Sequence, residues 1–126
     1  MMRITNHGAP FVLQHEQKLL SGSSGATRLS QSISKVTSSP NKIDFVCCFS
    51  ADGGKFSNAQ MLANQTGLPV VGYHGRVNLL KANSTTNDGV TFYPQKSKLT
   101  AQVCSSMNSI LATPVKLLIS VRNLLN

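Results

Sequence analysis

Apolar residues along the chain recur in two patterns, and together these patterns predict alternating strands and helices. The most apolar run, Ile43 to Phe49, is rich in branched and aromatic side chains and is bounded by turn-forming residues. Such a run is typical of a strand buried on both faces. Shorter β-prone segments predict further strands at residues 2–5, 11–13, 68–73, 76–80 and 90–93.

Helices are predicted where apolar residues lie three and four positions apart. A first helix is expected after the small-residue loop at residues 21–25, with Leu29, Ile33 and Val36 on one face. Residues 38–41, Ser-Ser-Pro-Asn, are expected to end this segment, because proline and its preceding residue disfavour helix.

Helix-capping residues delimit the later helices. Ser57 is a favoured N-cap residue and Gly67 a favoured C-cap residue, so a helix is predicted between them. Another begins near Lys98. The pair Thr113-Pro114 then resembles a new helix start, because proline is favoured at the first helical position. Residues 98–126 are therefore expected to form two helices.

The alternation of strands and helices predicts an α/β fold. We expect a small three-layer sandwich with a mostly parallel central sheet and helices on both faces, formed by residues 1–126 as a single domain. Active sites of such sheets lie outside the carboxyl ends of the strands. This rule directs attention to Cys48 and the loop that follows it.

Composition and charge narrow the function classes. The net charge is +8, from 12 Lys+Arg and 4 Asp+Glu, but the basic residues are spread along the chain. This favours anionic partners in general and predicts no specific nucleic-acid binding. The three cysteines, two of them adjacent, predict free thiols. We expect no transmembrane segment and no Sec-type signal, because no long apolar run is present.

Candidate chemistry centres on the thiol at the end of the apolar strand. Cys48 is a candidate nucleophile, and either His7 or His74 is a candidate general acid/base. Each histidine precedes a glycine, and the backbone N–H of Gly8 with that of Cys48 forms a candidate oxyanion hole. The alternative is a purely structural role: a buried strand cysteine that acts as a small hydrophobic residue, and two histidines that lie in turns.

A second candidate site is an anion-binding loop. Gly53, Gly54 and Lys55 precede a predicted helix and offer backbone N–H groups and an ammonium group, and Arg76 is a further candidate for anion binding. The full phosphate-binding loop motif is not met, because Phe56 stands where that motif has serine or threonine. No metal site is predicted, since the cysteine and histidine spacings match no known ligand pattern.

The order of these motifs resembles that of caspase-like (clan CD) cysteine peptidases. His7-Gly8 after one strand, Cys48 after the next, and the helix sequence Ala59 to Val70 are most similar to compact caspase-like domains of bacterial secreted effectors and polymorphic toxins. The resemblance covers residues 3–95. It implies a caspase-like sandwich with Cys48 as nucleophile and His7 as general acid/base. Cys47 departs from the alanine frequent in the family, and strand alternation leaves Cys47 open as the alternative nucleophile.

The expected function is a bacterial effector or toxin domain that acts as a Cys/His-dependent hydrolase, a peptidase, on a protein of a host or competitor cell. The expected location is the bacterial cytoplasm before export, followed by secretion without a Sec signal peptide, into a host cell. The alternative is a catalytically inactive binding module whose basic surface docks an anionic partner. No cofactor is required, although an anionic activator such as an inositol phosphate is a third hypothesis.

Overall fold

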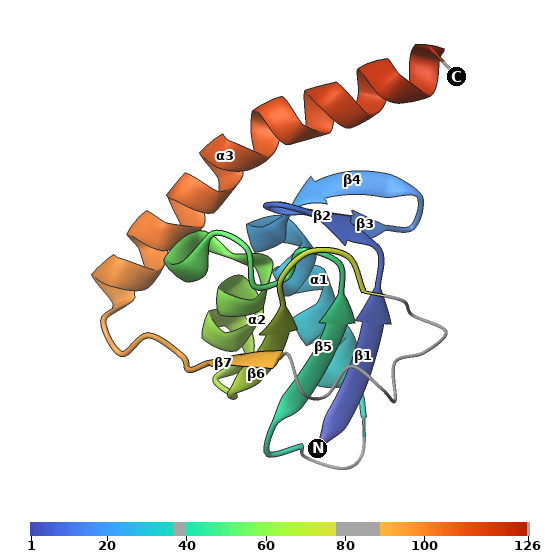
Figure 1. Ribbon diagram of the computed structural model, residues 1–126. Coiled ribbons are helices and arrows are strands. Elements are labelled where there is room, and N and C mark those ends of the chain that lie inside the picture. The colour runs from blue at the N-terminus through green and yellow to red at the C-terminus, as the bar shows by residue number, and fades with distance from the viewer. Residues whose placement is uncertain (37–39, 78–88, 126) are drawn as a thin grey trace.

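A computed structural model describes residues 1–36, 40–77 and 89–125, and its larger sheet is mostly parallel (Figure 1). The strand order is β1-β5-β6-β7, with β1, β5 and β6 parallel and β7 antiparallel to β6. The four strands are β1 (Met2–Asn6), β5 (Ile43–Cys47), β6 (Val70–Tyr73) and β7 (Gly89–Phe92). The predicted α/β class and mostly parallel sheet are confirmed.

A smaller antiparallel sheet follows β1 and precedes the first helix. Its strands are β2 (Gly8–Ala9), β3 (Val12–His15) and β4 (Lys18–Ser21), in that order. The sequence predicted only one strand in this region. The small sheet contacts both the first helix and the C-terminal helix, so it bridges the central sheet and that last helix (Figure 1).

The first helix, α1 (Gly22–Ile33), begins inside the segment predicted to be a loop. The Ser21 hydroxyl oxygen accepts a hydrogen bond from the Ser24 N–H at 3.1 Å and caps the helix. A Cβ on Gly22 would lie 1.9 Å from Asn58 Oδ1. Small residues are therefore needed here for close packing, and the loop prediction is wrong because their local preference is overridden by tertiary contacts.

The second helix, α2 (Asn58–Thr66), has the predicted limits. Ser57 Oγ accepts a hydrogen bond from the Gln60 N–H at 3.1 Å, and Gly67 ends the helix with a φ of 73°. Both cap predictions are confirmed. A short 3-10 helix, η1 (Gly54–Phe56), lies between β5 and α2.

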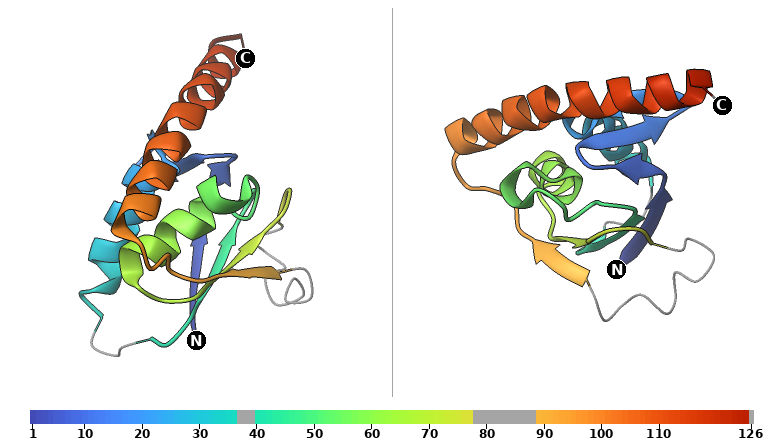
Figure 2. Two further views of the ribbon diagram at one scale, coloured as in Figure 1. Left: turned by 90° about the vertical axis from the view of Figure 1, so that its left-hand side faces the viewer. Right: turned by 45° about the horizontal axis from the view of Figure 1, so that its top comes forward.

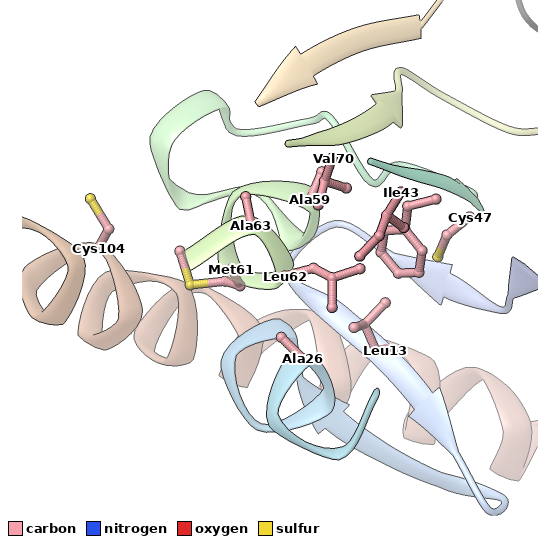
Figure 3. Close-up of a cluster of buried hydrophobic side chains, with 11 residues drawn as sticks. Leu13, Ala26, Ile43, Cys47, Ala59, Met61, Leu62, Ala63, Val70 and Cys104 are labelled. Atoms are coloured by element: carbon pink, nitrogen blue, oxygen red, sulfur yellow. The ribbon is translucent and has the colours of Figure 1, made fainter. Parts of the chain in front are cut away.

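The core lies between the larger sheet and the helices α1 and α2 (Figure 3). Alternate β5 residues Ile43, Phe45 and Cys47 point toward this core, and all five β5 residues are buried, as predicted. In the described residues α1 and α2 lie on the same face of the sheet (Figure 2), which differs from the expectation of helices on both faces. On the opposite face, the buried Asp44 carboxylate accepts hydrogen bonds from Tyr73 Oη and Arg3 Nε.

The C-terminal residues form one helix, α3 (Lys98–Leu125), where two were predicted. Thr113 does not cap a new helix, because its Oγ donates to the Ser109 carbonyl within the same helix. Pro114 therefore lies in the helix interior. The C-terminal end of α3 projects past the rest of the chain (Figure 2).

One further prediction concerns the strand expected at residues 76–80. The segment predicted as a strand at 76–80 contains no strand at residues 76 and 77, and residues 78–80 lie outside the described residues. Strand β7 pairs with β6.

The sequence predicted no transmembrane segment, yet residues Lys98–Leu124 of α3 are long and apolar enough to cross a membrane. Length and composition alone are weak evidence for a span, since core helices of soluble proteins meet the same criterion.

Candidate functional site

Three sequence-predicted site residues follow neighbouring parallel strands at the same edge of the sheet. Strand β5 lies between β1 and β6, with Asn6 of β1 aligned with Cys47 of β5. His7, Cys48 and His74 directly follow β1, β5 and β6, respectively. This is the carboxyl edge at which open α/β sheets place their chemistry.

The adjacent cysteines have different surroundings. Cys47 is fully buried in the core, whereas Cys48 is partly exposed. Burial raises the pKa of the Cys47 thiol to about 12, and the neighbouring Cys48 thiol adds to the rise. Cys47 is therefore a protonated thiol at neutral pH, which disfavours it as a nucleophile. All three cysteines are free.

The Cys48 side chain is held by the segment that follows β6. Its Sγ accepts a hydrogen bond from the Val77 N–H at 3.2 Å and lies 3.4 Å from the Val77 carbonyl oxygen. The neighbouring residue Phe49 has a φ of 61° and donates its N–H to the Gly75 carbonyl at 2.7 Å. The turn after β5 is therefore pinned to the turn after β6.

His74 forms a close pair with Asp52 across these two turns. Its Nδ1 lies 2.5 Å from Asp52 Oδ1, and Asp52 Oδ2 accepts the Gly75 N–H at 3.3 Å. The His74 side chain is 62% exposed, and its Nε2 has no hydrogen bond to a described residue. Sequence reasoning did not assign Asp52. The available signal was its position in the loop after β5, the strand adjacent to β6, which His74 follows.

His7 lies on the other side of β5 and faces the smaller sheet. It is exposed and lines a surface hollow with Gln14 and Glu16. Among the described residues, no hydrogen bond joins His7 to either adjacent cysteine. A Cβ on Gly8 would lie 2.6 Å from Cys47 Sγ. Gly8 therefore packs against the buried cysteine. The structure joins His74 to Asp52, while Cys48 Sγ has no hydrogen bond to either His7 or His74 among the described residues.

The predicted anion-binding residues lie in two different settings. Gly53 has a φ of 97° and precedes η1, which contains Gly54 and Lys55. Lys55 lines a shallow hollow with the α3 residues Leu99 and Val103. Arg76 is exposed in the segment after β6. In the part of the chain that the structure describes, no group of three or more His, Cys, Asp or Glu residues is arranged to hold a metal ion.

These features define a small α/β domain with Cys, His and Asp side chains at one sheet edge and a long apolar C-terminal helix. The family model described as secreted effector protein SteB matches residues 1–126, and the chain belongs to this family. It is 48% identical over 122 residues to the secreted effector protein SteB of Salmonella typhimurium strains 14028s and LT2, covering 97% of this chain and 90% of each relative. No solved structure matches.

Family membership confirms the coarser part of the sequence-based prediction. The chain is a secreted effector, and its relatives carry the same description. The resemblance to caspase-like peptidases is not shown by these comparisons, which name no activity.

Proposed function

We propose that this effector hydrolyses an amide bond in a host protein, with Cys48 as nucleophile and His74 as general acid/base oriented by Asp52. The observation that carries the proposal is the 2.5 Å contact between His74 Nδ1 and Asp52 Oδ1 beside the turn that bears Cys48. A carboxylate on Nδ1 fixes the imidazole orientation and leaves Nε2 for proton transfer. This choice of base differs from His7, which the caspase-like resemblance implies.

The proposed reaction uses the thiol in two steps. His74 Nε2 takes the Cys48 proton while the sulfur attacks the substrate carbonyl carbon, and the C–N bond then breaks as the same proton passes to the departing amine. Water, deprotonated by His74, hydrolyses the resulting thioester and restores the thiol. Because the Val77 backbone holds Sγ at 3.2 Å, the sulfur must leave this contact before attack.

The role of each histidine can be separated by substitution. We expect His74→Ala and Asp52→Asn to slow iodoacetamide labelling of Cys48 at pH 7 by about tenfold or more, since the base or its orientation is lost. His7→Ala tests the base that the resemblance implies, and His15→Ala is the control for loss of a histidine outside the site. A larger effect of His7→Ala than of His74→Ala would transfer the base role to His7.

Peptidase activity itself is tested on host proteins. A host-cell lysate is incubated with the purified chain, and new protein N-termini are identified by mass spectrometry. We expect new N-termini with the wild type and with Cys104→Ala, and none with Cys48→Ala. The same set of N-termini with Cys48→Ala, or none with the wild type, would contradict the proposal.

A non-catalytic binding role is the second candidate function. It is favoured by one observation: within the described ranges, Cys48 Sγ contacts the Val77 backbone and no histidine hydrogen-bonds to it. In this role the thiol only pins the two turns, and the basic surface binds an anionic host partner. The cellular effect should then survive Cys48→Ala but weaken with Arg76→Gln or Lys96→Gln.

The proposed anionic activator has a direct test. Inositol hexakisphosphate at saturating concentration should raise the melting temperature of the chain if it binds the folded state. Lys55→Gln and Arg76→Gln should reduce that shift. An unchanged melting temperature would remove the activator hypothesis and leave both candidate functions in place.

A further inference from the structure

We infer that α3 docks on the surface of an anionic lipid membrane through an outward-facing row of apolar side chains. This inference is independent of the proposed hydrolase activity. The row, here called the outer stripe, comprises Leu99, Val103, Ile110, Leu117, Val121 and Leu124.

The outer stripe follows one side of the helix along its length. Its spacings of four, seven, seven, four and three residues keep all six side chains within roughly a 60° arc at ~100° per residue. Their exposure ranges from 43% at Val121 to 86% at Leu124. A helix of 28 residues is about 42 Å long, so the stripe is an extended apolar surface.

The opposite side of α3 attaches the helix to the domain, and its fully buried residues are small or polar. Cys104, Asn108 and Ala112 are buried there. Asn108 Oδ1 accepts the Ser23 N–H at 2.8 Å, and its Nδ2 donates to the Phe56 carbonyl at 2.7 Å. Leu111, Val115 and Ile119 lie on this inner side as well and are half-buried. Because the hydrogen bonds of Asn108 fix the inner side toward the domain, the outer stripe faces away from the domain and remains available to a partner.

The charges around the outer stripe select an anionic partner. Residues 98–125 contain no Asp or Glu, while Lys98 and Lys116 are 18 residues apart, about five turns, and so lie on the same flank of the stripe. Lys55 lines the hollow beside Leu99 and Val103, and Arg122 lies in the last turn. Apolar side chains flanked by lysines match a bilayer interface, where anionic headgroups attract the ammonium groups.

A second copy of the chain fits this surface less well. Val103, Ile110, Leu117 and Leu124 recur every seven residues, as in a coiled coil. A coiled-coil seam also needs apolar residues three or four positions later. The positions three later hold Ser106, Thr113 and Ser120, and the positions four later hold Met107, Pro114 and Val121. In the first register half of the seam is polar, and in the second Met107 is half-buried and Pro114 lies at the centre of the seam, so neither register offers a second helix a continuous apolar surface.

A spanning helix also fits less well, although α3 meets the length and apolarity criterion. Spanning would remove Asn108 from its hydrogen bonds to Ser23 and Phe56 and place its amide in hydrocarbon, which is costly. Surface docking keeps these contacts, since only the outer stripe enters the interface.

Vesicle flotation of the purified full chain tests the inference. We expect the protein to float with phosphatidylcholine vesicles containing 30% phosphatidylserine, and to bind at least tenfold more weakly to phosphatidylcholine alone. The triple variant Ile110→Ser, Leu117→Ser and Leu124→Ser should lose about tenfold or more in affinity for the anionic vesicles. The control variant Val36→Ser with Val90→Ser, which removes exposed apolar residues outside α3, should bind like the wild type.

The charge contribution is measured separately. Lys98→Gln and Lys116→Gln should each weaken binding to anionic vesicles by roughly fivefold, and added salt should reduce this difference. Circular dichroism checks that each variant remains folded. Cys48→Ala should float like the wild type, so failure of the hydrolase proposal leaves this result unchanged.

Several outcomes would overturn the inference. Equal binding to neutral and anionic vesicles, or unchanged binding of the triple variant, would exclude this docking mode. A dimer in lipid-free solution that the triple variant dissociates would assign the outer stripe to a second copy. Protein retained in vesicles after a carbonate wash at pH 11 would indicate a spanning helix.

Discussion

Helices α2 and α3 use their apolar residues in opposite ways. Helix α2 buries Ala59, Leu62 and Ala63 in the core and is capped at both ends. Helix α3 buries Asn108 and small side chains on its inner face, while its leucines at 99, 117, 118 and 124 are exposed. A helix that only stabilised the fold would bury its large apolar residues, so α3 is built to attach to the domain and to present a surface.

The largest expected difference between the two helices concerns leucines of equal size. Leu62→Ala in α2 removes a fully buried side chain and should lower the free energy of unfolding by about 2–5 kcal/mol. Leu117→Ala in α3, where the side chain is 65% exposed, should change it by less than about 0.5 kcal/mol. Urea unfolding followed by circular dichroism measures both. Similar losses for the two variants would show that α3 is part of the core.

The attachment of α3 is tested by its buried amide. Asn108→Ala leaves the Ser23 N–H and the Phe56 carbonyl without this partner and should lower the free energy of unfolding by about 2 kcal/mol. Asn123→Ala, at an exposed position of the same helix, is the matched control.

A thiol-labelling experiment shows whether Asn108→Ala weakens the contact between α3 and the rest of the domain. Cys104 is buried on the inner side of α3, while Cys47 is buried in β5 of the larger sheet. If α3 detaches locally, Asn108→Ala should speed thiol labelling of Cys104 by roughly tenfold or more and leave Cys47 unchanged. Equal acceleration at both thiols would mean that the domain unfolds as one unit.

Local sequence rules predicted the elements that are defined by capping residues or by a continuous apolar run. Ser57 and Gly67 delimited α2, and the apolar run containing Phe45 identified β5. The rules failed where tertiary contacts decide the outcome. Helix α1 begins in a glycine- and serine-rich segment because Gly22 packs against Asn58. Helix α3 continues through Pro114, and the Thr113 hydroxyl donates to the Ser109 carbonyl within the helix instead of capping a new one.

The candidate site was predicted in position but not in detail. The carboxyl edge of β5 and Cys48 beside it followed from the fold class, with His7 as the first candidate base and His74 as the alternative. The pairing of His74 with Asp52 depends on a turn in which Phe49, a non-glycine residue, has a φ of 61°. Such a backbone conformation is uncommon and has no sequence signature, so the direction of Asp52 was not predictable.

The loss of stability at alkaline pH tests whether the Cys47 thiol in β5 is shielded from solvent. Cys47 ionises near pH 9.0 in an unfolded chain but near pH 12 when buried, because its pKa is raised by burial. The stability that the protonated thiol contributes is therefore fully present below pH 9 and is lost as the pH rises toward 12. Between pH 7 and pH 10 the loss in the free energy of unfolding should be about 1–2 kcal/mol.

Substitution of each cysteine shows which thiol causes this loss of stability at alkaline pH. Cys47→Ala should remove that part of the decline in urea-unfolding experiments at pH 7 and pH 10. Cys48→Ala, which removes the neighbouring partly exposed thiol, is the matched control and should retain the decline. An identical decline in Cys47→Ala and the wild type would mean that solvent reaches Cys47 in the folded state.

The smallest expected difference concerns the two serines that precede α2 and α3. Ser57 Oγ is fully buried and accepts the Gln60 N–H at 3.1 Å, whereas the Ser97 hydroxyl accepts the Thr100 N–H at 3.3 Å at an exposed position. Ser57→Ala should lower the free energy of unfolding by about 1 kcal/mol, because an N–H in the core loses its acceptor. Ser97→Ala should cost only a few tenths of a kcal/mol, since water replaces the hydroxyl and the first turn of α3 frays locally. Equal costs in urea unfolding would show that the start of α3 is coupled to the core as firmly as α2, contrary to the contrast drawn between them.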